Sequence, residues 1–501
     1  MQINGIYDSL INLQEDAFSK VALSEYERTL SHPNVQFVFA GQQIGILTGP
    51  ALTIYKALSA VAYAEKLELD TGVPTIPVFW MQTEDHDLKE ISELFYFNNS
   101  EISKLSFGFD LESSQLNSNR RSVSDFKLSN DDLAKLSPLL SQEHYQFIND
   151  AKELRIDDLF EVMLSRLLAN RCPLILNPRK FFNVKAVQEK LSEVFLIALD
   201  KMQLIDNNLL LASKELENEG GVKIIKNSPL FFYHPHATLD QKGERYRFVG
   251  VSSESNNLID KFEISNIQFR ATAKQLKELI LNSVNSFSTS ALLRPIVQDS
   301  LFNTAAFLGG VSELNYHRQL VDIYPIFGIS QPKLVERAHV VVLDKKMETF
   351  LHEEGLSADR LELEIEEILS NFKDRAQVET LQLGLGRIEQ AVIDFKLSLE
   401  KIDKSLNEAF LKTSDKFLEL SRNMLPKAQK SILIKDESKF KKLSRAKKAY
   451  SPLDKAQERV VSGYQISNLV GQEGIDFIYS RIKDNYNSKS STQITYIVEK
   501  I

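Results

Sequence analysis

Residues 35–50 read VQFVFAGQQIGILTGP, and this stretch decides the fold class. Its β-branched and aromatic first part predicts a buried strand that ends at Gly41. Residues 51–68 then place apolar side chains at helical spacing, and residues 75–81 (TIPVFWM) predict a second buried strand. Strand, loop, helix and strand in this order predict a βαβ unit with a right-handed crossover and two parallel strands. The expected fold class is therefore α/β, with a Rossmann-like parallel-sheet core.

The glycine-rich segment that follows the first strand is a candidate ligand loop. Because parallel strands have their carboxyl ends at the same edge of a sheet, this segment should meet the one that follows the second strand, where ligands of open α/β sheets bind. Its backbone N–H groups and the next helix N-terminus would suit an anion, although the pattern is neither a Walker A loop nor a GxGxxG fingerprint. The alternative is a tight βα turn in which the glycines serve packing. Lys56 lies on the helix behind the loop.

The second segment reads TEDHD and places Glu84, Asp85, His86 and Asp87 at the same edge. Carboxylates that flank an imidazole are expected to raise the pKa of His86 and to make it a general acid or base. Two alternatives stay open: the carboxylates hold Mg²⁺ with a nucleotide phosphate, or the segment is a solvated acidic turn. A structural zinc site is disfavoured, because the chain has one cysteine and no second histidine nearby in sequence.

The rest of the core is predicted to span residues 1–344, with inserted regions at about 97–160 and 205–285. Three further apolar runs predict core strands, at 173–177, 304–308 and 339–343. Residues 230–251 alternate in polarity around a QKGE turn and predict a β-hairpin, on which His234 and His236 should point the same way.

Residues 345–448 are predicted to form a long helical arm. Apolar residues from Ile388 to Ala409 alternate spacings of four and three, which is the a/d pattern of a coiled coil and favours a homodimer. Pro426 is expected to interrupt the arm, so that residues 427–450 return as an antiparallel partner. Residues 427–448 hold nine Lys or Arg against two acidic residues, which indicates a solvated helix face. Residues 449–501 are expected to return to the core.

Composition narrows the function classes. The 501 residues exceed the usual size of one hydrophobic core. An apolar fraction of 43%, a charged fraction of 26% and a net charge of −8 argue against broad binding to nucleic acid or to a membrane surface. No apolar run is long enough to span a bilayer, and no signal-peptide pattern is present. With Cys172 as the one cysteine, no intrachain disulfide can form, and a cytoplasmic protein is expected.

Four motifs together resemble the bacillithiol biosynthesis cysteine-adding enzymes (BshC). They occur in that family's order along nearly the whole chain: AGQQIGILTGPALTIYK, IPVFWMQTEDHDLKEI, LLRPIVQDSLFNTAAFLGGVSELNY and QER at 457–459. The resemblance implies a Rossmann-like core with connecting-peptide insertions and an α-helical coiled-coil domain used in dimers. It also implies the joining of L-cysteine to the amine of glucosaminyl-malate, with ATP as the co-substrate that activates the carboxylate and Mg²⁺ as a candidate companion ion. No resident protein metal site is expected.

The resemblance also assigns residues, motif by motif. The first loop would line the nucleotide or amino-acid pocket, through Gly41, Gln42, Gln43, Gly45 and Thr48. The acidic loop would lie opposite as the catalytic group, with Glu84, Asp85, His86 and Asp87, of which Asp85 or His86 would orient the amine or take its proton. A third set would anchor the malate carboxylates or the sugar: Arg294, Gln298, Glu313, Asn315 and Tyr316.

The chain departs from the family pattern at three places, which bear on fine substrate contacts. Gly309-Gly310 stands where a Gly-Pro pair is usual, His317 where an aromatic residue is usual, and Tyr55 where a histidine is common. Two other functions stay open at this point. One is another adenylate-forming amide ligase, and the other is a non-enzymatic nucleotide-binding scaffold that works through its coiled coil.

Overall fold

The computed structural model describes most of the chain and divides it into two compact units. Met1–Tyr96, Ser103–Val340 and Val461–Ile494 make up the first unit, and Phe97–Ile102, Val341–Val460 and Thr495–Ile501 the second. The structure describes residues 2–13, 26–99, 101–108, 121–150, 155–216, 221–238, 241–252, 259–369, 375–402, 405–435, 437–488, 493–499 and 501.

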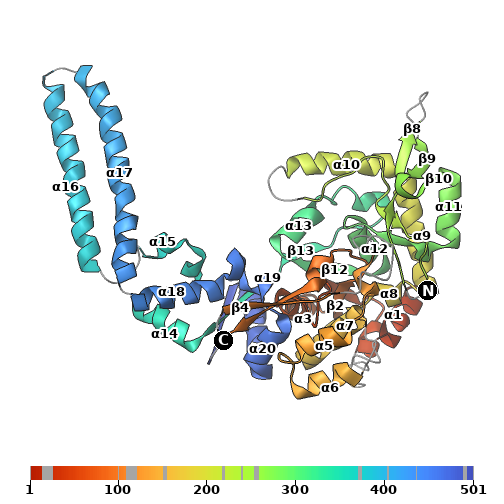
Figure 1. Cartoon of the computed structure of the whole chain (residues 1–501). Coiled ribbons are helices and arrows are strands. Elements are labelled where there is room, and N and C mark those ends of the chain that lie inside the picture. Colours follow the sequence, from red (N-terminus) through yellow and green to blue (C-terminus); the bar gives the residue numbers. More distant parts are fainter. Residues whose placement is uncertain are drawn as a thin grey trace. The chain divides into compact units, whose positions relative to one another are not determined.

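A five-stranded parallel sheet forms the centre of the first unit (Figure 1). In spatial order its strands are β13 (Lys333–Glu336), β12 (Thr304–Gly309), β1 (Gln36–Gln43), β2 (Thr75–Gln82) and β5 (Leu174–Leu176). The chain order reverses between β1 and β12, as in a doubly wound sheet, and ligands of such sheets bind beside this reversal. The sequence-based prediction of a Rossmann-like parallel sheet is confirmed.

Strands β1 and β2 are buried on both faces, as parallel strands covered by helices should be. Helix α3 (Leu52–Thr71) connects them, and its residues from Leu52 to Ala64 are all buried. Strand β1 does not end at Gly41 as expected but pairs with β2 as far as Gln43. A Cβ atom at Gly41 would lie 2.8 Å from the Trp80 carbonyl oxygen, so this glycine lets the two strands pack.

One predicted core strand lies in a different sheet. His339–Asp344 forms β14, which pairs with β15 (Gln493–Val498). The edge of the five-stranded sheet is β13 instead, a four-residue strand that the sequence analysis missed. A run of β-branched residues predicts a strand but does not specify its neighbour, which explains this error.

The inserted regions carry small sheets and helices. The first region holds β3 (Glu93–Asn98), β4 (Glu101–Ser106), the 3-10 turn η2 (Val123–Asp125), α5 (Asn130–Leu136) and α6 (Gln142–Asp150). Helices α7 (Ile156–Leu168), α8 (Pro178–Phe181), α9 (Lys185–Asp200) and α10 (Met202–Glu215) follow. The second region holds the antiparallel sheets β11-β6-β7 (Phe287–Thr289, Phe231–Tyr233, Tyr246–Arg247) and β10-β9-β8 (Phe269–Thr272, Ile259–Ile264, Val249–Ser252), with α11 (Ala273–Asn282).

The predicted hairpin at 230–251 is confirmed as a strand pair, with Tyr233 opposite Tyr246. Strand β6 ends at Tyr233 and β7 begins at Tyr246, so a tight turn at QKGE does not join the two strands. The two histidines of this region do not point the same way, because His234 is buried and His236 is exposed.

The C-terminal part of the first unit fixes the glycine-rich loop. Helix α20 (Gly463–Ser488) packs along α3, where the Tyr63 and Tyr486 rings lie 5.3 Å apart. The N–H of Ala51 donates to the Val461 carbonyl oxygen, and the N–H of Gly463 donates to that of Gly49, both at 2.8 Å. The loop is therefore held by chain that is remote in sequence.

The second unit is largely helical. Its helices are α14 (Lys345–Glu354), α15 (Ile365–Leu369), α16 (Arg375–Glu400), α17 (Ser405–Lys435), α18 (Glu437–Tyr450) and α19 (Gln457–Val460). Helices α16 and α17 lie side by side as an antiparallel pair (Figure 1), with Arg422 Nη2 2.8 Å from Glu389 Oε1. The predicted coiled-coil arm is confirmed.

The expected interruption at Pro426 is wrong. Pro426 lies inside α17, and the chain reverses between the end of α16 and the start of α17. A proline removes one backbone hydrogen bond, and a long helix with a packed partner tolerates that loss. Within the described ranges, no helix has the length and apolar character needed to cross a membrane.

Candidate active site

The two loops predicted to meet do so at the carboxyl edge of the sheet. Gln43, the last residue of β1, donates through Nε2 to Asp85 Oδ2 in the segment after β2. The other oxygen of Asp85 accepts the backbone N–H of His86 at 2.6 Å. This contact fixes the Asp85 carboxylate, so the glutamine and the acidic loop form one site.

Lys56 is a buried cation that links β1 to the helix after β12. It comes from α3 and is 4% exposed. Its Nζ donates to the Gly41 carbonyl oxygen at 2.8 Å, to Gln42 Oε1 at 2.9 Å and to Glu313 Oε2 at 2.5 Å. Burial lowers the pKa of Lys56, and the Glu313 carboxylate acts in the opposite direction. The sequence signal was a lysine within the apolar run of a buried helix.

A second cluster lies on α12 (Leu293–Leu301) and α13 (Val311–Arg318), the helices that flank β12. Arg294 is buried and donates to Gln298 Oε1 at 3.3 Å and to the Tyr316 hydroxyl at 3.1 Å. The His317 ring stacks on Phe307 with centroids 4.0 Å apart. The structure therefore brings Arg294, Gln298 and Tyr316 together, and the Arg294 guanidinium is engaged by protein groups.

Other predicted residues are placed as follows. Asn315 is buried and accepts from Arg318 Nη1 at 2.8 Å. Gly45 and Thr48 are buried, and a Cβ atom at Gly463 would lie 2.7 Å from Thr48 Oγ1. Asp87 is exposed. In the first loop, Gln42 and Gln43 are thus the half-buried polar members.

Glu84 faces the inserted sheet β11-β6-β7. Its Oε2 accepts from the Thr289 hydroxyl at 3.2 Å and from the Thr289 N–H at 3.3 Å, and its Oε1 lies 3.7 Å from Lys242 Nζ. Burial raises the pKa of Glu84, and Lys242 partly opposes that effect. Lys242 Nζ also donates to the carbonyl oxygens of Asn285 at 2.9 Å and Phe287 at 3.1 Å. A carboxylate with a raised pKa is suited to accept a proton.

The expectation of a raised pKa at His86 is wrong. Burial lowers the pKa of His86 to about 2, and the cationic Arg245 adds to the effect. A hydrogen bond to the Glu84 backbone acts in the opposite direction and does not outweigh the effect of burial on this pKa. His86 is therefore a neutral imidazole at physiological pH. Its ring lies 6.2 Å from that of His234, which pairs with Ser288 Oγ at 2.7 Å.

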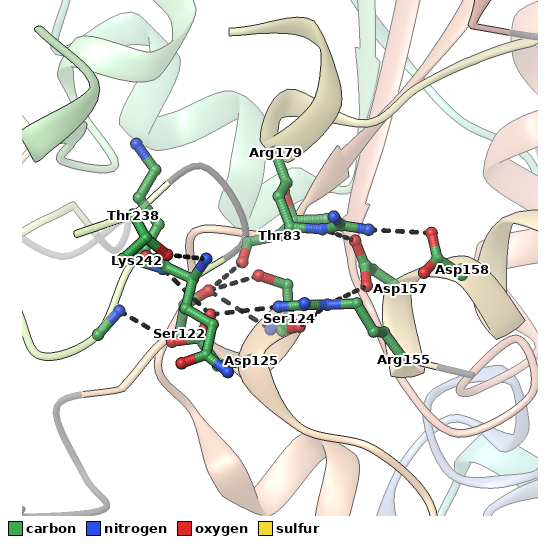
Figure 2. Close-up of polar contacts among 12 residues, drawn as sticks. Thr83, Ser122, Ser124, Asp125, Arg155, Asp157, Asp158, Arg179, Thr238 and Lys242 are labelled. Atoms are coloured by element: carbon green, nitrogen blue, oxygen red, sulfur yellow. Dashed lines mark hydrogen bonds and ion pairs between the residues drawn. The ribbon is translucent and has the colours of Figure 1, made fainter. Parts of the chain in front are cut away.

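Residues 122–125, which we call the strap, connect the acidic loop to the loop that precedes β7 (Figure 2). Ser122 Oγ donates to the Thr83 carbonyl oxygen at 2.5 Å, and the Val123 N–H donates to that of Asp85 at 2.8 Å. The Asp125 carboxylate accepts from the N–H groups of Lys242 at 3.2 Å and Gly243 at 2.9 Å. The strap thus positions Lys242 relative to the loop that carries Glu84.

A network of three ion pairs lies beside this region. Figure 2 shows Arg155 and Arg179 beside Asp157, where Arg179 Nε lies 2.5 Å from Asp157 Oδ2 and Arg179 Nη2 lies 2.9 Å from Asp158 Oδ1. Arg155 Nη2 lies 3.7 Å from Asp125 Oδ1, which connects this network to the strap. The sequence analysis named none of these residues, because they come from separate, irregular segments without a shared motif.

Comparison with known proteins gives the family. A model of the bacillithiol biosynthesis BshC N-terminal Rossmann-like domain matches residues 5–338, and the model of the BshC C-terminal coiled-coil domain matches residues 340–496. The chain belongs to the BshC family. The resemblance stated from the motifs is thereby confirmed.

Full-length BshC relatives align along most of the chain. A protein of Bacillus cytotoxicus named "Putative cysteine ligase BshC" is 25% identical, covering 91% of this chain and 84% of the relative. Proteins with the same name from Bacillus anthracis and Geobacillus sp. are 27% and 24% identical and cover 90% and 93% of this chain, and 82% and 85% of the relatives. These names support a ligase enzyme, as the sequence predicted.

A solved structure titled "putative arginyl t-RNA synthetase", from Campylobacter jejuni, aligns over 96% of this chain and 98% of its own. The sequence identity is 11% and the TM-score 0.26, which is too low to support an argument about fold or function.

Proposed function

We propose that this BshC-family protein is a cytoplasmic cysteine ligase that joins L-cysteine to the amine of glucosaminyl-malate in the last step of bacillithiol biosynthesis. The observation that carries the proposal is the meeting of three segments at the strand-order reversal. Gln43 binds Asp85 after β2, and Lys56 binds both Gln42, near the end of β1, and Glu313, which follows β12. Polar side chains from all three carboxyl ends thus converge where a ligand of this fold binds.

Amide formation from a free carboxylate requires activation, for which ATP is the proposed co-substrate. The cysteine carboxylate would attack the α-phosphorus and release pyrophosphate, giving a mixed anhydride with AMP. The amine of glucosaminyl-malate would then attack the carbonyl carbon, lose a proton and expel AMP. Positioning the two reactants and removing the amine proton are the tasks of the protein.

Residues at the carboxyl ends of β1 and β12 are proposed to bind the anionic co-substrate. Lys56 Nζ, which donates to Gly41, Gln42 and Glu313, would exchange one of these acceptors for a phosphate oxygen, and Gln42 supplies a half-buried amide. Among the described residues, no group of three or more His, Cys, Asp or Glu is placed to hold a metal ion. Mg²⁺ would therefore enter on the nucleotide phosphates, which is its usual mode in such enzymes.

The acidic loop fits the second half of the reaction. With a pKa near 2, His86 is a poor proton acceptor, so the proton of the attacking amine is assigned to a carboxylate. Glu84, whose pKa burial raises, and Asp85, which Gln43 orients, are the two candidates.

A homodimer through the arm is part of the proposal. The α16–α17 pair leaves apolar side chains of α17 exposed, including Phe417 at 51%, Leu420 at 58% and Met424 at 58%. Such a surface on two amphipathic helices suits a second copy of the same pair.

The deciding experiment incubates the purified protein with cysteine, glucosaminyl-malate and ATP. Mass spectrometry should detect a product whose mass is the sum of the two substrates minus water, formed only when all three are present. Release of AMP and pyrophosphate would support the adenylate route, whereas ADP and phosphate would contradict it. Replacing glucosaminyl-malate by a panel of other amines distinguishes this ligase from another amide ligase, which would prefer one of those amines.

A matched pair of variants separates an enzyme from a nucleotide-binding scaffold. Asp85→Asn should lower kcat/KM by about 100-fold or more, as the loss of a proton-transfer or orienting group does. Asp322→Asn, which changes an exposed aspartate, should leave the rate unchanged. If the protein binds nucleotide but forms no product with any of the amines, the non-enzymatic scaffold is favoured and the proposal is overturned.

A further inference from the structure

Two arginines lie against one aromatic ring on the inserted sheet β11-β6-β7. The Arg245 and Arg247 Cζ atoms are 4.5 Å and 4.6 Å from the centroid of the Phe232 ring. Phe232 and Arg247 are cross-strand partners, so their side chains share a face of the sheet. Arg245 precedes Arg247 by two residues and projects to the same face.

The opposite face of this sheet belongs to the hydrophobic core. Phe231, Tyr246 and Phe287 alternate with the residues above and are buried in the core cluster, where the Phe231 and Phe287 rings lie 5.5 Å apart. The sheet therefore has one apolar face and one cationic face.

The cationic face lies beside the acidic loop. His234 occupies the same face as Phe232, and its ring lies 6.2 Å from the ring of His86. Arg245 is close enough to Asp85 and Glu84 for their charges to favour its cationic form. The two arginines thus border the acidic loop, whose carboxylates are proposed to take the proton of the attacking amine.

Neither arginine forms an ion pair with a carboxylate among the residues that the structure describes. Arg247 has one long hydrogen bond, from Nη1 to Ser228 Oγ at 3.5 Å. The nearby carboxylates are engaged elsewhere, Asp85 with Gln43 and Glu84 with Thr289. Burial lowers the pKa of Arg245, and the positive charge of Arg247 lowers it further. Two half-buried cations held this close repel one another, and an anion bound between them would relieve that repulsion.

We propose that Arg245 and Arg247 form a subsite for a dicarboxylate, the malyl group of the amine substrate. A guanidinium binds a carboxylate through two parallel hydrogen bonds, and two guanidiniums provide one such fork for each carboxylate. The place of the subsite fits the amine substrate, because Arg245 borders the acidic loop, whereas Lys56 binds Gly41 of β1 and Glu313 after β12. This inference rests on the proposed function for the identity of the ligand. It moves the malate anchor from Arg294, which protein groups already engage, to the inserted sheet.

Binding of malate alone tests the subsite without any turnover. Isothermal titration of the full-length protein should give saturable binding of malate, and about tenfold weaker binding of lactate, which lacks the second carboxylate, and of inorganic phosphate. Arg245→Gln and Arg247→Gln should each weaken malate binding by about tenfold or more, as the loss of a charged hydrogen bond does. Arg247→Lys should retain part of the affinity, because the charge remains and the fork is lost.

The matched control is Arg270→Gln, which changes an exposed arginine of β10 and should leave malate binding unchanged. Circular dichroism and thermal unfolding identify variants that lose the fold. If a Gln variant does not fold, the corresponding Lys variant replaces it in the binding test. Unchanged malate affinity in a folded Arg245→Lys/Arg247→Lys variant overturns the proposal, as does phosphate binding as tight as that of malate. Malate binding that depends on the two arginines, in a protein without ligase activity, would support the subsite and contradict the proposed cysteine ligation.

Discussion

Lys56 Nζ lies 2.5 Å from Glu313 Oε2, and this contact joins the helix after β1 to the helix after β12. The two strands are neighbours at the point where the strand order reverses. The Lys56 side chain is 6% exposed and that of Glu313 14%, so water screens the pair poorly. Gly309 permits the approach, because a Cβ atom there would lie 3.2 Å from Glu313 Oε2.

Replacing Lys56 by methionine is expected to destabilise the fold, because it leaves the Glu313 carboxylate buried without its cation. Loss of one partner of a buried pair costs about 3–5 kcal/mol in the free energy of unfolding. Urea unfolding followed by circular dichroism measures this change. The double variant Lys56→Met/Glu313→Leu should recover part of the loss in stability but not ligase activity.

Lys66→Met is the matched control. Lys66 pairs with Asp70 on the exposed part of the same helix, and an exposed pair contributes about 1 kcal/mol or less. Equal destabilisation by the two lysine variants would show that the buried pair has no special role.

The buried His86 predicts a fall in stability on acidification. Its pKa is about 2 in the folded state against 6.5 in the unfolded state, so below pH 6.5 the unfolded chain binds a proton that the folded chain does not. The free energy of unfolding should therefore decrease by about 1.4 kcal/mol for each pH unit below 6.5 from this residue alone. His86→Gln should remove that slope, in urea unfolding at pH 7, 6 and 5.

His234, whose pKa burial lowers to about 3, should behave in the same way. His32→Gln, at an exposed position, provides the control and should leave the slope unchanged. If the His86→Gln variant keeps the full wild-type slope of unfolding free energy against pH, the His86 imidazole is protonated in the folded protein. His86 would then again be a candidate general acid.

The sequence predicted the parts of the site that lie directly after the central strands. Gln43 ends β1 and Asp85 follows β2, and these parallel strands are adjacent, so the meeting of the two residues follows from strand pairing alone. The pKa of His86 could not be predicted, because it depends on burial and on Arg245 from another sheet. Lys242 comes from a loop whose position depends on tertiary hydrogen bonds to Asp125. Such long-range contacts leave no periodic signal in a sequence.

Asp125 is predicted to act as a positioning residue. Asp125→Ala removes the acceptor for the N–H groups of Lys242 and Gly243, which should destabilise the fold by about 1–3 kcal/mol and let Lys242 move from Glu84. Because Lys242 lowers the pKa of Glu84, that pKa should rise. In a pH–rate profile, the acid limb of kcat/KM should shift to higher pH.

Asp131→Asn is the control for this variant, since Asp131 is an exposed residue of α5. It should change neither the stability nor the pH profile. A purely structural role for Asp125 would lower the stability and leave the acid limb in place.

The arm predicts a dimer that charge on its apolar face should dissociate. A chain of 57.1 kDa should elute with about twice that mass in size-exclusion chromatography with light scattering. Leu420→Glu/Met424→Glu places two carboxylates on side chains that are each 58% exposed, so the isolated chain should tolerate them while the paired surface should not. Lys412→Glu, on the exposed polar side of α17, should remain dimeric. A monomeric wild-type protein, or an unchanged mass in the double variant, would show that α17 does not form the subunit contact.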